Sequence, residues 1–523
     1  MEKKFVCTAD EPVVKTDAGK LRGYIYDGVY TFHGIKYADA ERFQMPHPVE
    51  HWDGIKDAVN YGYVCPIMDT PLPKSELYIP HRFWPMNENC QYLNIWTTSL
   101  DGAEKKPVFV WLHGGGFSDG SGIEQVSYEG DNLAKKSGMV VVTLNHRLNI
   151  LGYMDLSSYS RKYDNSVNVG IADLVAALVW IKRNISAFGG DPDNVTIIGQ
   201  SGGGGKVEAL LQTPAAEGLF HRGILMSGVI AMPQEGDFDY RRLASGIMKR
   251  LGIEEKDVEK LETVPYGELA RAAQETMAAE DMNLMWGPVG NGWIKGDPLK
   301  VGFSEYAKRM PLMAGSVATE LGSRNNLAEE NKRTEEEKMR DIEAQYGNSE
   351  KLVEIFRRTY PGKDIGVLQK IDTLFKPQLI DFAEAHAKEA TGPLYLYQFN
   401  LTFDIKGGAC AWHCSDIPFV FRNTSRIPSA NIQGVTEKLE GQVSGSFSNF
   451  ARNGNPNGAG VDLPEWLPYT EDHRITMLFD RKCEARPDFD TELQKALLET
   501  GRCQTWDSFN KKKNPKAPKD WIY

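Results

Sequence analysis

Short apolar runs alternate with amphipathic stretches along most of the chain, and this alternation predicts its architecture. Residues 108–112 and 139–144 are nearly continuous apolar runs, which indicates strands buried on both faces. Residues 171–185 carry apolar side chains at the helical period of about 3.6 residues. Further strands are predicted at residues 195–198, 222–227, 312–317 and 394–399. Strands and helices in this order predict an α/β fold with a large, mostly parallel central sheet flanked by helices.

The N-terminal stretch has a different pattern. Extended runs at residues 13–16, 19–26 and 29–33 are separated by turns rich in Asp and Gly, which predicts antiparallel hairpins at one edge of the sheet. Residues 36–92 carry many Pro, aromatic and polar residues with little periodicity, and they predict a long surface loop.

Two long charged stretches, residues 237–285 and 327–390, have a mostly helical pattern. Within the second, Thr334 and Glu337 have the spacing of a capping box at the start of a helix. We interpret both stretches as helical insertions over the sheet. Because no repeat, low-complexity run or Ser/Gly linker marks a boundary, we predict a single domain over residues 1–523.

Composition and charge narrow the possible partners. The chain has 523 residues, of which 41% are hydrophobic and 25% charged, as in an ordinary soluble globular protein. The formal net charge of -11 disfavours nucleic acid as a partner, because a nucleic-acid-binding surface is basic. The first residues lack the apolar core of a signal peptide and the apolar runs are too short to span a bilayer, so we expect a cytoplasmic protein without a membrane span. The sequence does not indicate an oligomeric state.

The sequence around Ser201 is the main chemical motif of the chain. A β-branched run ends at Gly199, the pattern Gly-x-Ser-x-Gly places Ser201 at its centre, and helical spacing resumes after the glycines. Strand, sharp turn and helix form the context of a nucleophile elbow, in which small residues such as Gly202 and Gly203 must flank the serine. The helix dipole then favours negative charge that develops beside Ser201.

The glycines that end at Lys206 also resemble a phosphate-binding loop, but the match fails. Such a loop needs Gly at position 200 and Ser or Thr at position 207, where this chain has Gln200 and Val207. A metal site is equally disfavoured, because no second Cys or His pair accompanies residues 410–414 at zinc-site spacing. We therefore expect no cofactor and no metal.

A serine nucleophile needs a base, an acid that orients the base, and donors for the oxyanion. In α/β-hydrolases the order along the chain is serine, acid, histidine. Glu320 follows the predicted strand 312–317 and is the candidate acid, with a helix-capping surface residue as the alternative. His413 lies in a loop of small residues and is the candidate base. His386, in a charged helix, and His473, in a polar turn, fit solvated faces.

His113 begins a run of three glycines directly after the predicted strand 108–112. Backbone N–H groups in such a loop point at one oxygen, as in the oxyanion loops of esterases and lipases. A plain Gly-rich turn is the alternative, but the pairing with Gly-x-Ser-x-Gly favours an oxyanion loop.

Longer motifs give a specific resemblance to a known family. Residues 188–203 resemble the active-serine signature of the type-B carboxylesterase family, which is cholinesterase-like and para-nitrobenzyl esterase-like. Residues 88–95 resemble the second signature of that family. The similarity extends from residues 34–43 to residues 450–457 and so covers nearly the whole chain. The resemblance implies an α/β-hydrolase fold.

The resemblance also implies roles for individual residues. Ser201 would be the nucleophile, His413 the general base and Glu320 its orienting acid. Ser227 would support these three residues from behind, and Arg42 would form a structural ion pair with Glu88. The implied oxyanion donors are the backbone N–H groups of Gly115, Gly116 and Gly202.

The chain departs from the family pattern on both sides of the serine and after the histidine. Gln200 replaces the usual Glu before the serine, and Gly202 replaces the usual Ala after it. After the histidine the usual pattern is His-Gly-x-Glu, where this chain has Cys414 and Asp416 in place of the Gly and the Glu. None of these changes removes the nucleophile or a backbone donor, so activity should survive, whereas Cys414 would make the site sensitive to oxidation. Cys65 and Cys90 match the first disulfide of the family, but in a reducing cytosol free thiols are the alternative.

We therefore predict a serine hydrolase that cleaves small-molecule carboxylic esters through an acyl-enzyme intermediate. Hydrolysis of amides, carbamates or lactones is an alternative, since these motifs do not identify the leaving group. A non-catalytic interaction protein on the same fold is a further alternative, which the intact Ser201, Glu320 and His413 disfavour. The aromatic residues that could line a substrate pocket, with core packing as an equal explanation for each, are Trp84, Phe117, Trp286, Trp412 and Phe419.

Overall fold

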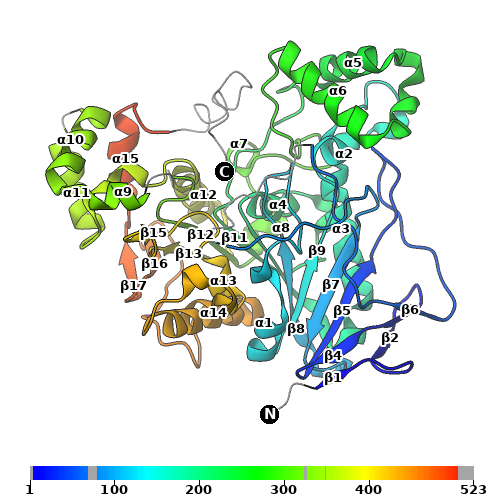
Figure 1. Cartoon of the computed structure of the whole chain (residues 1–523), viewed down its shortest axis with the longest axis horizontal. Coiled ribbons are helices and arrows are strands. Elements are labelled where there is room, and N and C mark those ends of the chain that lie inside the picture. The colour runs from blue at the N-terminus through cyan, green and yellow to red at the C-terminus, as the bar shows by residue number, and fades with distance from the viewer. Residues whose placement is uncertain (1–3, 69–78, 323–326, 348, 505–523) are drawn as a thin grey trace.

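The computed structural model of the protein describes residues 4–68, 79–322, 327–347 and 349–504 (Figure 1). Within this part of the chain the centre is a 12-stranded sheet. In spatial order its strands are β1 (Phe5–Val6), β4 (Tyr24–Tyr26), β5 (Val29–Lys36), β7 (Tyr92–Thr97), β9 (Val140–Leu144), β8 (Lys106–Leu112), β10 (Gly190–Gln200), β11 (Arg222–Met226), β12 (Leu312–Val317), β13 (Leu394–Phe399), β16 (Ile475–Phe479) and β17 (Glu484–Pro487). Neighbours from β9 to β16 run parallel and the strands outside them are antiparallel. The predicted parallel centre is therefore confirmed. Of the predicted N-terminal hairpins, the pair β4 and β5 lies at the edge of this sheet, whereas residues 13–15 and 20–22 pair antiparallel in a separate small sheet.

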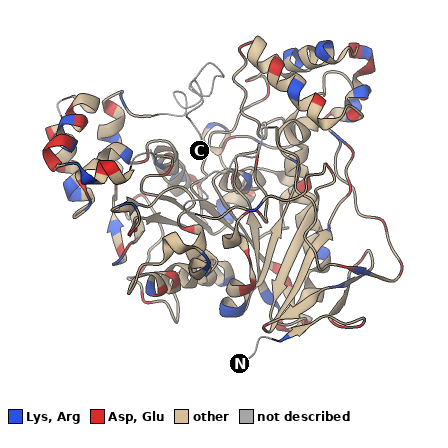
Figure 2. Ribbon diagram, in the orientation of Figure 1, with Lys and Arg blue, Asp and Glu red and all other residues tan. Residues whose placement is uncertain are grey.

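The central strands bury alternate side chains in two hydrophobic cores, one on each face of the sheet. In β8, Val108 and Val110 belong to the first core, and Phe109 and Trp111 belong to the second. Successive side chains of a strand face opposite sides, so a strand that is apolar at every position packs against helices on both faces. Figure 2 shows that the strands carry few charged residues, which gather on the outer helices with both signs intermixed.

Helices cover both faces of the sheet. The first core lies against α3 (Val169–Asn184), α4 (Gly202–Leu211) and α12 (Phe375–Glu389), and the second against α1 (Asp131–Ser137) and α14 (Thr436–Asn453). The other described helices are α2 (Asn149–Tyr153), α5 (Tyr240–Leu251), α6 (Tyr266–Ala279), α7 (Pro298–Val301), α8 (Glu305–Arg309), α9 (Leu327–Lys332), α10 (Glu335–Tyr346), α11 (Glu350–Thr359), α13 (Ile417–Val420) and α15 (Thr491–Glu499). Two small sheets consist of β2 (Val13–Lys15), β3 (Lys20–Arg22) and β6 (Ile55–Asp57), and of β14 (Thr402–Phe403) and β15 (Ala409–Cys410).

Both charged stretches that the sequence marked as helical are helical. α5 and α6 lie at the upper right of Figure 1, and α9 to α11 at the upper left, away from the central strands. Thr334 caps α10 by the predicted reciprocal hydrogen bonds with Glu337. α12 differs from the other helices of its stretch, because it connects β12 to β13 and packs against both. The second stretch therefore ends in a helix of the central fold rather than in an insertion.

His386 corrects one expectation from the sequence. Its ring is buried and packs against Phe303 and Phe382, instead of lying on a solvated face. Burial lowers the pKa of His386 to about 4, so the ring is neutral at physiological pH. The charged, alanine-rich sequence around it concealed the fact that this side of α12 faces the first core.

One stretch of the described chain, residues 161–188, is long and apolar enough to cross a membrane by length and composition. In the folded protein 72% of its most apolar window is buried. The stretch contains α3, whose Leu174, Leu178 and Ile181 are part of the first core. Its apolar character is therefore explained by packing against the sheet.

A buried ion pair ties the long N-terminal loop to this core. Arg147 follows β9 and binds both carboxylate oxygens of Asp173 on α3, with Nη2 at 2.7 Å from Oδ1 and Nε at 2.9 Å from Oδ2. The two side chains are 2% and 0% exposed. Nη1 of Arg147 also donates to the carbonyl oxygens of Glu41 and Gln44, which lie in the loop of residues 36–92. The pair thus fixes a loop that has little regular structure of its own.

Replacing Arg147 with Met should lower the free energy of unfolding by about 3–5 kcal/mol, because the Asp173 carboxylate would remain buried without its partner. Urea denaturation measures this loss. Lys182→Met is the control, since it removes an exposed ion pair with Asp193 and should cost less than about 1 kcal/mol. Equal losses for the two variants would contradict the role given to Arg147.

Candidate active site

Ser201 lies at the turn between β10 and α4 and is held in a strained conformation. Its φ of 58° and ψ of -128° are unfavourable for a residue with a Cβ atom. The N–H of Ser201 donates to the carbonyl oxygen of Met226 at 2.8 Å, and the N–H of Gly204 donates to the carbonyl oxygen of Ser201 at 2.8 Å. These bonds hold the side chain at the carboxyl end of the parallel strands, where α4 begins.

The glycine loop after β8 lies directly against this turn. Gly115 and Gly116 have φ values of 86° and 62°, which glycine adopts without strain. A Cβ atom added to Gly202 would lie only 2.1 Å from the carbonyl oxygen of Gly116. Alanine, the usual residue of the family at this position, would therefore push the loop away from the turn. The departure at Gly202 is thus explained by the close approach of the two backbones.

The structure brings Glu320 and His413 together, next to Gln200, the residue that precedes Ser201. Nδ1 of His413 is hydrogen-bonded to Oε2 of Glu320, and the backbone N–H of His413 donates to the carbonyl oxygen of Glu320 at 3.0 Å. The other carboxylate oxygen of Glu320 accepts the N–H of Val317 at 2.8 Å. Glu320 is completely buried, so its carboxylate is held in one orientation. This arrangement places the ring proton on Nδ1 and leaves Nε2 as the basic nitrogen.

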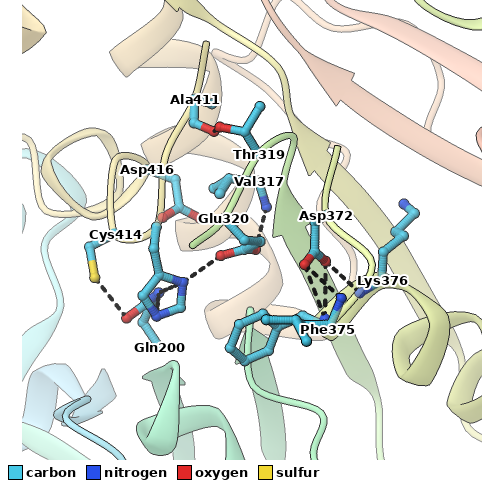
Figure 3. Close-up of polar contacts among 12 residues, drawn as sticks. Gln200, Val317, Thr319, Glu320, Asp372, Phe375, Lys376, Ala411, Cys414 and Asp416 are labelled. Atoms are coloured by element: carbon cyan, nitrogen blue, oxygen red, sulfur yellow. Dashed lines mark hydrogen bonds and ion pairs between the residues drawn. The ribbon is translucent and has the colours of Figure 1, made fainter. Parts of the chain in front are cut away.

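Two side chains contact the imidazole of His413. The ring of Phe375 stacks on it, with centroids 5.2 Å apart and an interplanar angle of 20°. The amide nitrogen of Gln200 lies 3.4 Å from Nδ1 and 3.3 Å from Nε2. An atom nearly equidistant from both nitrogens lies against the ring face, not along either lone pair. The thiol of Cys414 donates to Oε1 of Gln200 at 3.2 Å, so the departures next to Ser201 and next to His413 contact each other (Figure 3).

Within the described part of the chain, the Ser201 hydroxyl makes no hydrogen bond to His413 or to another side chain. The contact between nucleophile and base is often long in unliganded enzymes and shortens when substrate binds. His413 and Glu320 are therefore held together in this structure without a hydrogen bond from the described Ser201 hydroxyl.

Ser227 lies directly behind the turn. Its N–H donates to the carbonyl oxygen of Gly315 at 2.7 Å, and the carbonyl of the preceding Met226 receives the N–H of Ser201. The Ser227 hydroxyl is buried and has no hydrogen-bond partner among the described residues. The residue thus directly follows β11, is hydrogen-bonded to β12, and carries a buried hydroxyl without a partner among the described residues.

Two of the aromatic residues expected at a substrate pocket, Phe117 and Trp286, are buried in the first hydrophobic core. Phe117 follows the loop directly, and its ring lies 3.3 Å from the position of a Cβ atom on Gly205 or Gly287. Trp286 precedes Gly287 and is 7% exposed. Trp84 lies elsewhere in the N-terminal loop and donates its indole N–H to the carbonyl oxygen of Ile123 at 2.9 Å.

The other two aromatic residues pack in the second core. Trp412 lies 4.4 Å from Phe403, centroid to centroid, and Phe419 packs against Phe399 at 5.1 Å. Phe419 has no exposed surface, so it is a core residue in this structure and not a lining of an open pocket. For these positions the packing explanation is the better one.

Two buried carboxyl groups to which the motifs assigned no role lie close to Glu320 (Figure 3). Asp372 caps α12, accepting the N–H groups of Phe375 at 3.1 Å and of Lys376 at 2.6 Å. Asp416 accepts the hydroxyl of Tyr397 at 3.0 Å. Burial, reinforced by the negative charge of Glu320, raises the pKa of both Asp372 and Asp416 to about 7. One sequence pattern could have identified Asp372, because it is an Asp three residues before an aromatic residue at the start of a helix.

The cysteines near the N-terminal loop are buried thiols. Cys65 and Cys90 are both free in this structure, and Sγ of Cys65 accepts the N–H of Leu148 at 3.2 Å. No three His, Cys, Asp or Glu side chains of the described residues are grouped in a way that could hold a metal ion.

Comparison with known proteins gives matches over almost the whole chain. The sequence profile of the Carboxylesterase family matches residues 10–506. Para-nitrobenzyl esterase of Bacillus subtilis is 32% identical over 500 residues, which cover 93% of this chain and 98% of that protein. An esterase of Clostridium hathewayi, described as able to hydrolyse aliphatic aromatic polyesters, is 45% identical with a TM-score of 0.90 and covers 95% of this chain and 100% of its own. A carboxylesterase of Geobacillus stearothermophilus has a TM-score of 0.72 at 31% identity, with 92% and 99% of the chains covered. The predicted α/β-hydrolase fold is confirmed by these structures.

Replacing Asp416 with Asn should flatten the pH dependence of stability. The folded-state pKa of about 7 lies above the value of about 3.9 in an unfolded chain, so the folded state holds this proton more tightly and loses stability as pH rises through 7. Between pH 5 and pH 8 the wild-type free energy of unfolding should fall by about 2–3 kcal/mol more than that of Asp416→Asn, measured by urea denaturation. If the free energy of unfolding changed equally with pH in the two proteins, Asp416 would be ionised in the folded protein over this whole pH range.

Proposed function

Because this chain belongs to the carboxylesterase family and hydrolyses carboxylic esters, we propose that Ser201, His413 and Glu320 carry out the reaction. The observation that supports these roles most directly is the hydrogen bond from His413 to the buried Glu320, beside the strained turn of Ser201. A serine hydroxyl is a weak nucleophile and requires a base that is itself held by an acid. These three residues provide that arrangement in the order expected along the chain.

In this proposal the ester carbonyl carbon is attacked by Oγ of Ser201 while Nε2 of His413 removes the hydroxyl proton. The tetrahedral intermediate collapses when His413 gives that proton to the leaving alcohol, and an acyl-enzyme remains. Water, deprotonated by the same imidazole, then attacks the acyl carbon and releases the acid and free Ser201. Glu320 keeps the ring oriented and stabilises its positive charge in both steps.

The negative oxygen of each intermediate requires fixed donors. We assign this role to the backbone N–H groups of Gly115, Gly116 and Gly202, which belong to two segments in close contact. Donors that are already in place cost no reorganisation during the reaction, and loss of one such donor typically costs about 10²–10³ in kcat. We assign to Ser227 a supporting position behind the turn.

The roles proposed above do not identify the acid and alcohol parts of the natural substrate. Amides, carbamates and lactones pass through the same type of tetrahedral intermediate, and they remain alternatives for a substrate panel. We propose Phe117 as a contact of the substrate because it directly follows the glycine loop, and Trp286 because the adjacent Gly287 lies against the Phe117 ring. The position of Trp84 in the N-terminal loop makes it a weaker candidate.

We also propose that residues 1–523 form one domain, because both hydrophobic cores are built on the same central sheet. A cytoplasmic location remains a prediction from the sequence.

Alanine at position 201 or 413 should lower kcat for a chromogenic short-chain ester by at least about a thousandfold, because residues that act as a unit cannot compensate for one another. Glu320→Gln should give a large loss as well, since the ring would no longer be held in its working orientation. His473→Ala is the matched control for the histidine, because its side chain is exposed, and it should retain full activity. Near wild-type turnover in Ser201→Ala would exclude the proposed nucleophile.

A second, more specific substrate class follows from the structural match. The esterase of Clostridium hathewayi described as hydrolysing aliphatic aromatic polyesters matches over 95% of this chain at 45% identity. We therefore propose that this protein also cleaves ester bonds in aliphatic aromatic polyesters.

Incubation of the protein with a film of an aliphatic aromatic copolyester should release aromatic diacid monomers, which liquid chromatography measures. Ser201→Ala should release none above the background, since chain cleavage would use the same nucleophile as small esters. Hydrolysis of small esters without monomer release from the film would limit the protein to soluble substrates.

A further inference from the structure

Lys206 lies in the helix that follows the nucleophile and has no part in the reaction described above. It belongs to α4, and its side chain has no exposed surface. Placing an ammonium group in a protein interior is costly unless it is hydrogen-bonded or its charge is compensated. The phosphate-loop pattern that ends at this lysine fails, so its burial requires another explanation.

The two contacts of the Lys206 ammonium lie at opposite ends of the glycine loop. Nζ donates a hydrogen bond of 2.7 Å to the carbonyl oxygen of His113, the residue directly before the glycines. Nζ also lies 5.8 Å from the ring centroid of Phe117, the residue directly after them, within the range of a cation–π interaction. The Lys206 side chain therefore contacts the residues on both sides of the glycine loop, residues 114–116.

The ionisable side chains around the Lys206 ammonium influence one another's charge. The rings of His113 and His146 lie 5.1 Å apart, and burial, reinforced by the charge of Lys206, lowers the pKa of both, so both are neutral. Each Nδ1 pairs with a neighbouring backbone carbonyl oxygen at 2.8 Å. Glu124 and Cys65 favour the charged form of Lys206, whereas burial lowers its pKa to about 7.

We propose that Lys206 is a positioning residue for the oxyanion loop, whose ammonium holds the His113 carbonyl and the Phe117 ring so that the N–H groups of Gly115 and Gly116 converge beside Ser201. The inference rests on the proposed function. A peptide unit is planar, so fixing the His113 carbonyl also fixes the direction of the N–H of Gly114 and the path of the loop.

The loop needs such an anchor because of its composition. Three successive glycines have more conformational freedom than any other tripeptide, and this freedom opposes a single arrangement of donors. At its other end the loop is held by the contact between Gly116 and Gly202. Directly after the loop, the N–H of Asn149 donates to the carbonyl oxygen of Phe117 at 2.7 Å. Lys206 supplies the hydrogen bond at the start of the loop.

Replacing Lys206 with Met tests the inference, because the thioether chain has a similar length but donates no hydrogen bond. We expect kcat for a short-chain chromogenic ester to fall by about 10- to 100-fold with KM within about threefold of wild type, as for impaired oxyanion stabilisation. The affinity for a trifluoromethyl ketone, which forms a hemiketal oxyanion on the serine, should fall by the same factor as kcat/KM.

Glu208→Gln is the matched control. Glu208 is buried in the same helix, and its carboxylate accepts the N–H of Ile230 at 3.1 Å, away from the glycine loop. This variant should keep kcat and ketone affinity within about twofold of wild type. A folded Lys206→Met protein with kcat within threefold of wild type would overturn the inference. So would a loss of kcat without a matching loss of ketone affinity, since that pattern would reflect a general structural effect.

If Lys206→Met does not fold, Lys206→Gln replaces it. Glutamine keeps a polar tip but is too short to reach the His113 carbonyl, so the same loss is expected, and wild-type kcat in this variant would also overturn the inference. Ser201→Ala, measured in parallel, separates the two proposals. Retained activity in Ser201→Ala rejects the proposed function, whereas inactive Ser201→Ala with fully active Lys206→Met rejects only the positioning role.

Discussion

The carbonyl oxygen of Gly116 lies where a Cβ atom of residue 202 would be, and the rest of the site depends on this contact between two backbones. It places N–H groups from two segments next to one serine. It also requires β8 and β10 to be neighbours in parallel register, because the glycine loop leaves the end of one strand and the nucleophile turn leaves the end of the other. The sheet therefore determines the geometry of the chemistry at its edge.

Most of the fold could be predicted because it rests on local patterns. Strands such as 312–317 and 394–399 are apolar at nearly every position, and the structure places β12 and β13 at these residues. The capping box at Thr334 is equally local. The packing of α12 was harder to predict, because a charged, alanine-rich sequence does not show which side of the helix faces the sheet. The burial of His386 depends on that tertiary packing, and the sequence pattern indicated the opposite.

The residues of the site likewise divide into those that local motifs identify and those that only the fold brings together. Ser201 and the glycine loop are contiguous motifs, and the sequence pattern alone identified them. The contacts of Gln200 with His413 and with Cys414 join residues more than two hundred positions apart, and only the folded sheet brings them together. Asp416 is also hidden in the sequence, since nothing local distinguishes a carboxyl group that will be buried beside another one.

The thiol of Cys414 offers a way to observe this site directly. Its sulfur lies 3.2 Å from the amide oxygen of Gln200, and that amide lies against the imidazole of His413. Conversion of the thiol to a thiocyanate would place a nitrile group beside the ring, and the stretching frequency of a nitrile responds to the local electric field. The protein therefore carries, in its own sequence, an attachment point for a vibrational reporter of the charge on His413.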